Sequence, residues 1–138
     1  MFDFENHSCH TYFMVIGDFD KDAFIGALGV TPTTVGAGGV PHRFRSELDT
    51  WTDITYGDNR EYCFNINDMI RETLAALFDK ADILKRLREE MNVKYYLVSS
   101  PKIISSCKKI KPILSLDRDI MAFLCDIGAD CDLDYYVY

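Results

Sequence analysis

One short segment near the start of the chain, Thr11–Ile16, limits what this protein can fold into. Its sequence, TYFMVI, is rich in β-branched and aromatic residues, which is typical of a strand. Alternate side chains of a strand lie on opposite faces, so Tyr12, Met14 and Ile16 share one face and Phe13 and Val15 share the other. Because both faces are apolar, we expect this strand to be central in its sheet.

Apolar periodicity and capping residues predict nine elements in the order β-α-β-β-α-α-β-α-β. We expect strands at Thr11–Ile16, Trp51–Tyr56, Glu61–Asn65, Val93–Val98 and Asp132–Tyr138. We expect helices that begin after Asp20, after Asn65 or Asn67, near Asp79 and after Asp117. This order favours an α+β fold, related to the ferredoxin-like order, with a mixed or antiparallel sheet and helices packed on one face.

Several boundaries follow from local signals. Phe19 and Phe24 flank the Asp20 cap as a hydrophobic staple, and the glycine-rich stretch 31–50 predicts a loop. Gly57–Asn59 predicts a turn between two strands. The pattern leaves open whether residues 68–92 are one helix or two, although Asp79 as an N-cap favours a break. Pro101–Pro112 reads as a basic connector with room for a short strand at Ile103–Ile104.

Length and charge narrow the class of protein. The chain has 138 residues, which fits a single domain over 1–138. Its formal net charge is -7, from 15 Lys+Arg against 22 Asp+Glu. Nucleic-acid binding needs a basic surface to neutralise phosphates, so we expect no nucleic-acid partner.

Targeting signals and cysteines indicate the compartment. No apolar run reaches the roughly 18 residues that span a bilayer, and the first residues are acidic where a secretory signal is basic. The five cysteines are odd in number and lack C-x-x-C spacing, so we expect reduced thiols, most of them in the core. We therefore expect a cytoplasmic protein without a membrane partner.

Charge is unevenly distributed along the sequence. Residues 1–70 carry a net -7, residues 80–111 carry +6, and residues 117–134 carry -5. Separated patches of this kind suit a specific protein partner better than uniform acidity does, because complementary patches steer association and select partners.

Two segments are candidate ligand sites. The loop 36–45 brings glycines close to cationic side chains, an arrangement that suits an anion: Gly38, Gly39, His42, Arg43 and Arg45. Asp132 and Asp134 share one face of the last predicted strand, where paired carboxylates can bind a divalent cation or act as acid and base. Ordinary structure explains both as well, as a surface loop and as a charged edge strand.

The chain resembles a bacterial family of domains of unknown function, numbered 4279. The likeness rests on the ALGVTPTT element (Ala27–Thr34), on the entry to the last helix at Leu114–Asp117, and on Gly128–Asp134 followed by the aromatic end Tyr135–Tyr138. The stretch VGAGGVPHRFR departs from the family pattern, which carries a Trp and a Gly-Lys pair there. The resemblance implies an α+β domain with no established reaction, and relatives look like parts of bacterial toxin–immunity systems in some settings.

These observations lead to two functional hypotheses. The first is a non-enzymatic, immunity-like protein-interaction domain, with aromatic strand ends at Tyr95, Tyr96 and Tyr136 as partner contacts. The second is a small-ligand or metal-binding module that uses the loop 36–45 or the Asp132/Asp134 face. No catalytic motif is evident, and we expect no cofactor.

Overall fold

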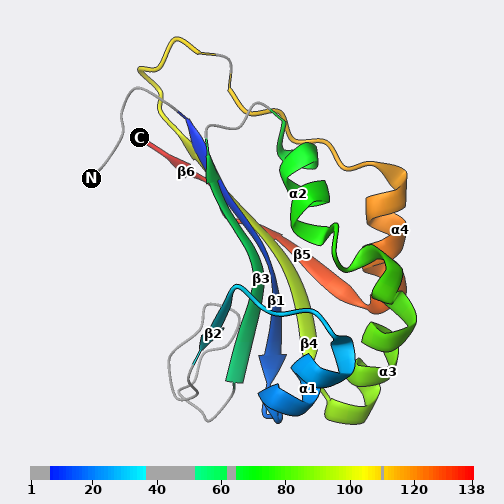
Figure 1. Ribbon diagram of the computed structural model, residues 1–138. Helices are drawn as coiled ribbons and strands as arrows, with labels where there is room; N and C mark the ends of the chain where they lie inside the picture. Colours follow the sequence, from blue (N-terminus) through cyan, green and yellow to red (C-terminus); the bar gives the residue numbers. More distant parts are fainter. Residues whose placement is uncertain (1–6, 37–51, 62–64, 110) are drawn as a thin grey trace.

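The computed structural model describes residues 7–36, 52–61, 65–109 and 111–138, and its elements are arranged as Figure 1 shows. The strands are β1 (Ser8–Gly17), β2 (Thr34–Gly36), β3 (Thr52–Glu61), β4 (Lys94–Ile103), β5 (Ala129–Leu133) and β6 (Tyr136–Val137). The helices are α1 (Lys21–Leu28), α2 (Ile66–Leu74), the 3-10 turn η1 (Phe78–Lys80), α3 (Ala81–Met91) and α4 (Arg118–Ile127).

The strand β1 lies in the middle of the sheet, as its two apolar faces predict. The order is β2-β3-β1-β4-β5, and β6 also pairs with β4. The pairs β2–β3, β3–β1 and β1–β4 are antiparallel, whereas β5 and β6 run parallel to β4. In the second half of β1 both faces are buried, with Phe13 and Val15 on one side and Met14 and Ile16 on the other. The mixed sheet confirms the predicted α+β class.

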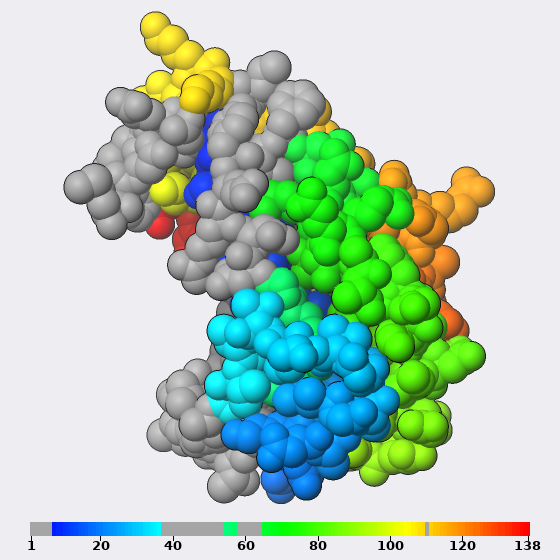
Figure 2. Space-filling view, viewed as in Figure 1, coloured from blue at the N-terminus to red at the C-terminus, as the bar shows by residue number. Residues whose placement is uncertain are grey.

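All four α-helices cover the same face of this sheet. Residues from each helix join one buried cluster with the side chains that β1, β3 and β4 direct toward them, among them Phe13, Ile54 and Leu97. Figure 2 shows the surface of α1 meeting that of α3 on this side of the molecule. We call the other side of the sheet the helix-free face. Among the described residues, no helix is long and apolar enough to cross a membrane.

A bulged strand replaces the hairpin predicted at 51–65. Thr11 pairs with Asn59 and Phe13 pairs with Tyr56, so two residues of β3 lie opposite Tyr12. Gly57 has a φ of 76°, the left-handed conformation that a glycine bulge uses. Gly57 does adopt a turn-like backbone conformation, but it lies inside one strand. The prediction of a turn between two strands is therefore wrong. The other strand of this region, β2, lies in the stretch predicted as a loop.

The first helix begins and ends where its capping residues predict. The Asp20 side chain accepts hydrogen bonds from the backbone N–H groups of Asp22 and Ala23. The rings of Phe19 and Phe24 meet edge to face, with centroids 5.5 Å apart. Gly29 closes the helix in the left-handed conformation.

The helical region 66–91 is broken, as we expected, but not by Asp79. Asn65 caps α2, since its side chain accepts from the Asn67 N–H. Asp79 lies inside η1, and the residue before α3 is Lys80, which makes no side-chain capping bond. The prediction of Asp79 as an N-cap is therefore wrong: a 3-10 turn links the two helices instead.

At α4 the predicted cap residue is in place, but its side chain bonds elsewhere. The Asp117 carboxylate accepts from Arg71 at 2.8 Å and from the Asn67 amide at 2.9 Å, and makes no capping bond. Arg71 also holds the Asp119 carboxylate through two bonds of 2.8 and 2.9 Å. This cluster ties the start of α4 to α2.

The last two predicted strands differ in extent from those observed. The strand expected at Val93–Val98 continues through Pro101 to Ile103, which absorbs the short strand we allowed for there. The strand expected at Asp132–Tyr138 is divided into β5 and β6. The thiols also differ from expectation: Cys9 is buried, but Cys125 and Cys131 are exposed, so most of the described cysteines lie outside the core.

Candidate functional site

The last ten residues form one edge of the sheet. We call residues 129–138 the C-terminal edge; in Figure 1 it is the red-orange end of the chain. β5 pairs with β4 from Tyr95 to Ser99, and β6 pairs with it at Lys102 and Ile103. Backbone bonds of 3.0 Å from the Asp134 N–H to the Ser99 carbonyl and of 2.8 Å from the Tyr138 N–H to the Ile103 carbonyl keep the whole segment against β4.

The end of α4 directs the chain into this edge. Gly128 follows the helix in the left-handed conformation, and its N–H bonds back to the carbonyls of Leu124 and Cys125. A Cβ atom at this position would lie 2.8 Å from the Arg88 guanidinium. Gly128 therefore allows both the turn and the close approach of α3.

The C-terminal edge carries acidic and aromatic side chains side by side. Asp130 and Asp132 pair with Tyr96 and Val98, so their side chains lie on the helix-free face. The large apolar side chains that this segment exposes are Leu133, Tyr135, Tyr136, Val137 and Tyr138. Tyr135 and Val137 are 66% and 63% exposed, the highest values among the large apolar residues described.

The carboxylates give this edge a negative potential, which contributes to raised pKa values in neighbouring side chains. Burial, with a smaller contribution from Asp130, raises the pKa of Tyr96. Partial burial of the sulfur, with a smaller contribution from Asp132, raises the pKa of the Cys131 thiol, although the residue as a whole is exposed. A thiol with a raised pKa stays protonated at neutral pH and is a weak nucleophile.

The predicted partner residues fall in three different places. Tyr95 is 1% exposed, and its hydroxyl donates to the Leu84 carbonyl at 2.7 Å, so it belongs to the core and is not accessible to a partner. Tyr96 is half-buried on the helix-free face. Tyr136 is exposed at the C-terminal edge, and its hydroxyl donates to Asp134 at 2.9 Å.

The predicted ligand residues are only partly placed. The loop residues Gly38, Gly39, His42, Arg43 and Arg45 lie outside the described residues. Asp132 lies in β5 and Asp134 just beyond it, where Asp134 accepts the Tyr136 bond. Within the described part of the chain, no three His, Cys, Asp or Glu side chains gather as they would around a metal ion.

Two buried polar groups escaped the sequence analysis. Cys9, Thr11 and Ser99 form a triangle of hydrogen bonds, with 3.4, 3.3 and 3.2 Å between their side-chain atoms, on the helix-covered face. His7 is fully buried and stands directly before β1. The Cys9–Thr11–Ser99 triangle could have been predicted in part, because Cys9 and Thr11 are two residues apart and therefore share one face of the first strand.

His7 joins two segments that are far apart in sequence. Its Nδ1 accepts the Ile104 N–H at 3.0 Å, so the ring proton is on Nε2, which lies 3.3 Å from the Lys109 carbonyl. The imidazole thereby holds the basic segment after β4 against the start of β1.

Comparison with known families gives one result. The family model of a domain of unknown function, DUF4279, matches residues 7–138, which is nearly the whole chain. This match confirms the resemblance that the ALGVTPTT element and the closing acidic–aromatic segment carry. No curated protein and no solved structure matches the chain.

Proposed function

The chain belongs to the DUF4279 family of domains of unknown function, and we propose that it is a non-enzymatic binding domain that holds an extended, basic segment of a partner protein along its C-terminal edge. In a toxin–immunity setting, that segment would belong to the toxin.

The proposal rests on the outer side of β5 and β6, against which no other strand of the described residues pairs. β5 is the last strand in the order of the described sheet, so its outer backbone groups face away from β4. Backbone N–H groups alternate along a strand, and the Asp134 and Tyr138 N–H groups bond toward β4. Those of Leu133 and Val137 therefore point outward. An edge of this kind can accept a further strand from another chain.

Charge and composition favour a basic partner. Asp130, Asp132 and Asp134 lie along the edge that an added strand would contact, and complementary charge speeds association and selects partners. Exposed Tyr135 and Val137 supply the aromatic and apolar contacts that are enriched in interfaces. The same three aspartates oppose a second copy of this chain at the edge, because like charges would face each other.

Site-specific photo-crosslinking tests this proposal in the cells that produce the protein. A benzoylphenylalanine at Tyr135 should capture a discrete protein, and the captured segment should be basic and free of proline. The same probe at Met121, which is 48% exposed on α4, is the matched control. Equal capture at both positions, or a captured segment that is acidic, would contradict the proposal. Capture of a second copy of this chain would replace it with self-association.

The other hypothesis, a divalent cation at Asp132 and Asp134, has less support. Two carboxylates supply fewer oxygens than the six to eight that Ca²⁺ takes, and Asp134 already accepts the Tyr136 bond. Melting curves with Ca²⁺ and Mg²⁺ test it, since a bound ion raises the melting temperature by mass action.

A further inference from the structure

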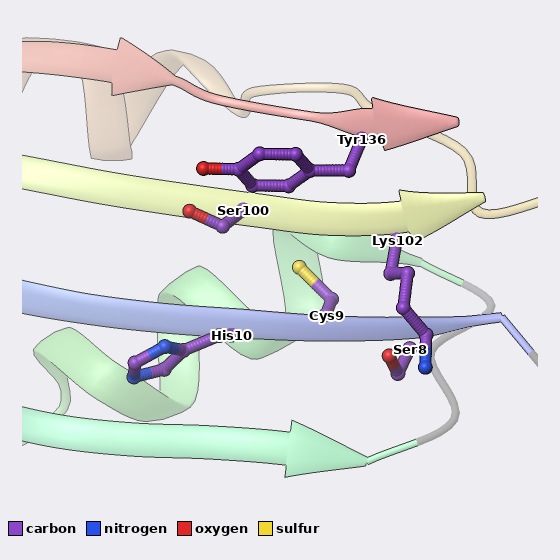
Figure 3. A pocket seen from close by; sticks show the side chains of 6 residues that line it. All are labelled: Ser8, Cys9, His10, Ser100, Lys102 and Tyr136. Atoms are coloured by element: carbon purple, nitrogen blue, oxygen red, sulfur yellow. The ribbon is translucent and has the colours of Figure 1, made fainter. Parts of the chain in front are cut away.

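A shallow depression of about 290 Å³ lies on the helix-free face, where β1, β4 and β6 run side by side. Among the described residues, its lining consists of Ser8, Cys9, His10, Ser100, Lys102 and Tyr136. Figure 3 shows the side chains of His10, Ser100, Lys102 and Tyr136 on the near side of the sheet, with the helices behind it. Cys9 borders the depression from within the sheet, because its side chain belongs to the helix-covered face. The volume is at the lower end of the range for small-molecule sites.

Strand register arranges these side chains in two rows. Ser8 pairs with Lys102, which pairs with Tyr136, so the first row crosses three strands. His10 pairs with Ser100, which gives the second row. The rows are two residues apart, about 7 Å along a strand. The depression therefore has two chemically different ends within reach of one small molecule.

The first row has the chemistry of an oxyanion site. Lys102 extends across β1 toward Ser8 in Figure 3. An ammonium group beside a hydroxyl suits phosphate, because both donate hydrogen bonds and the ammonium adds charge. The hydroxyl of Tyr136 gives its hydrogen to Asp134, so the phenol contributes its ring and an acceptor oxygen instead.

The second row suits the organic part of such a ligand. His10 and Ser100 offer hydrogen-bonding groups, and the His10 ring lies 4.7 Å from the Tyr12 ring, which extends the aromatic surface along β1. In Figure 3 the rings of His10 and Tyr136 lie on either side of Ser100. A ring with hydroxyl or amide groups can pack and bond there.

The surrounding charge limits where an anion can lie on the helix-free face. Asp132 and Asp134 face the same side from the edge and would oppose an anion placed near β5, which confines the favourable region to the Ser8–Lys102 end.

We propose that this depression binds a small phosphate monoester, with the phosphate at Lys102 and Ser8 and the organic ring between His10 and Tyr136. The site is separate from the outer side of the C-terminal edge, and it does not depend on the function proposed above.

Titration of the ¹⁵N-labelled protein with inorganic phosphate, ribose 5-phosphate and AMP tests this inference by NMR. Saturable shifts should appear at the amides of Ser8, His10, Ser100 and Lys102, and the two esters should bind more tightly than inorganic phosphate. Lys102→Met should weaken binding by about tenfold, the value of one charge-assisted hydrogen bond. Lys102→Gln replaces it if the methionine variant is not folded.

Lys94→Met is the matched control, because Lys94 lies on the same strand and the same face but pairs with Ile16, at the far end. It should leave the affinity within twofold of the wild type. The inference is overturned if none of the three probes gives saturable shifts, or if the Lys94 variant weakens binding as much as the Lys102 variant.

Discussion

Replacement of Gly57 by alanine tests the bulge that joins β3 to β1. Gly57 has a φ of 76°, where a residue with a Cβ atom is strained by roughly 1 kcal/mol. A Cβ atom there would also lie 2.7 Å from Cγ2 of Thr73 on α2. Overpacking of this kind costs about 1 to 3 kcal/mol, so Gly57→Ala should lower the free energy of unfolding by about 2 to 4 kcal/mol.

Urea and thermal unfolding measure this loss. In a domain of this length each kcal/mol shifts the melting temperature by about 3 to 4 °C, so we expect a fall of about 6 to 16 °C. Thr73→Ser removes Cγ2 and keeps the hydroxyl, which bonds to the Met69 carbonyl at 2.8 Å. In the Gly57→Ala background, Thr73→Ser should recover the part of the unfolding free energy that overpacking costs. The part that is due to backbone strain should remain lost.

Gly26→Ala is the control for the same chemical change. Gly26 lies in α1 with no atom within 4 Å of the added Cβ, so this variant should be stabilised by about 0.5 to 1 kcal/mol. A Gly57→Ala variant as stable as the wild type would refute the bulge. A loss that Thr73→Ser does not reduce at all would refute the contact with α2.

Three further predictions concern hydrogen bonds that the fold depends on. Arg71 holds the pKa of both aspartates at the start of α4 below the usual range, so their stabilisation is present above about pH 4 and is lost as the pH falls further. Arg71→Met should therefore flatten the fall in urea midpoint between pH 5 and about pH 2, whereas Arg86→Met, on the exposed side of α3, should not. His7→Leu leaves two backbone groups without their bonds, which should cost about 2 to 4 kcal/mol and speed hydrogen exchange at the Ile104 amide. Burial raises the pKa of Tyr56 to about 12, so the stability that its neutral hydroxyl contributes is present below pH 10 and is lost as the pH rises toward 12. Tyr56→Phe should therefore reduce the loss of stability at alkaline pH. An unchanged dependence of stability on alkaline pH would contradict the role given to Tyr56.

Capping and stop residues predicted those elements whose ends depend only on residues nearby in sequence. The Asp20 cap and the Gly29 stop lie within a few residues of the helix that they bound, and no distant group competes for them. The central position of β1 was predictable for a related reason. A strand with two apolar faces has few stable positions other than the middle of a sheet.

The elements that were wrong depended on partners far away in sequence. A glycine-containing turn signal is the same for a hairpin and for a glycine bulge, and here the pairing of β3 with β1 decides between them. Asp117 is a good capping residue, but Arg71, 46 residues earlier, binds its carboxylate. Neither outcome can be predicted without knowing which strands and helices are neighbours.

The candidate site shows the same division. Alternation along the last strand predicted that Asp132 faces away from Leu133. The Tyr95–Tyr96 pair was ambiguous, because alternation requires the two rings to point to opposite faces without saying which face is covered. The packing of Tyr95 against Phe13 and α3 decides it.

The central claim is that the outer side of the C-terminal edge accepts a strand from a basic partner. Hydrogen exchange of the Leu133 and Val137 amides, measured with and without a synthetic peptide of the photo-crosslinked segment, tests it most directly. We predict that both amides exchange at least about tenfold more slowly in the complex, because each gains a backbone acceptor. Unchanged exchange at both amides in a saturated complex would contradict the claim.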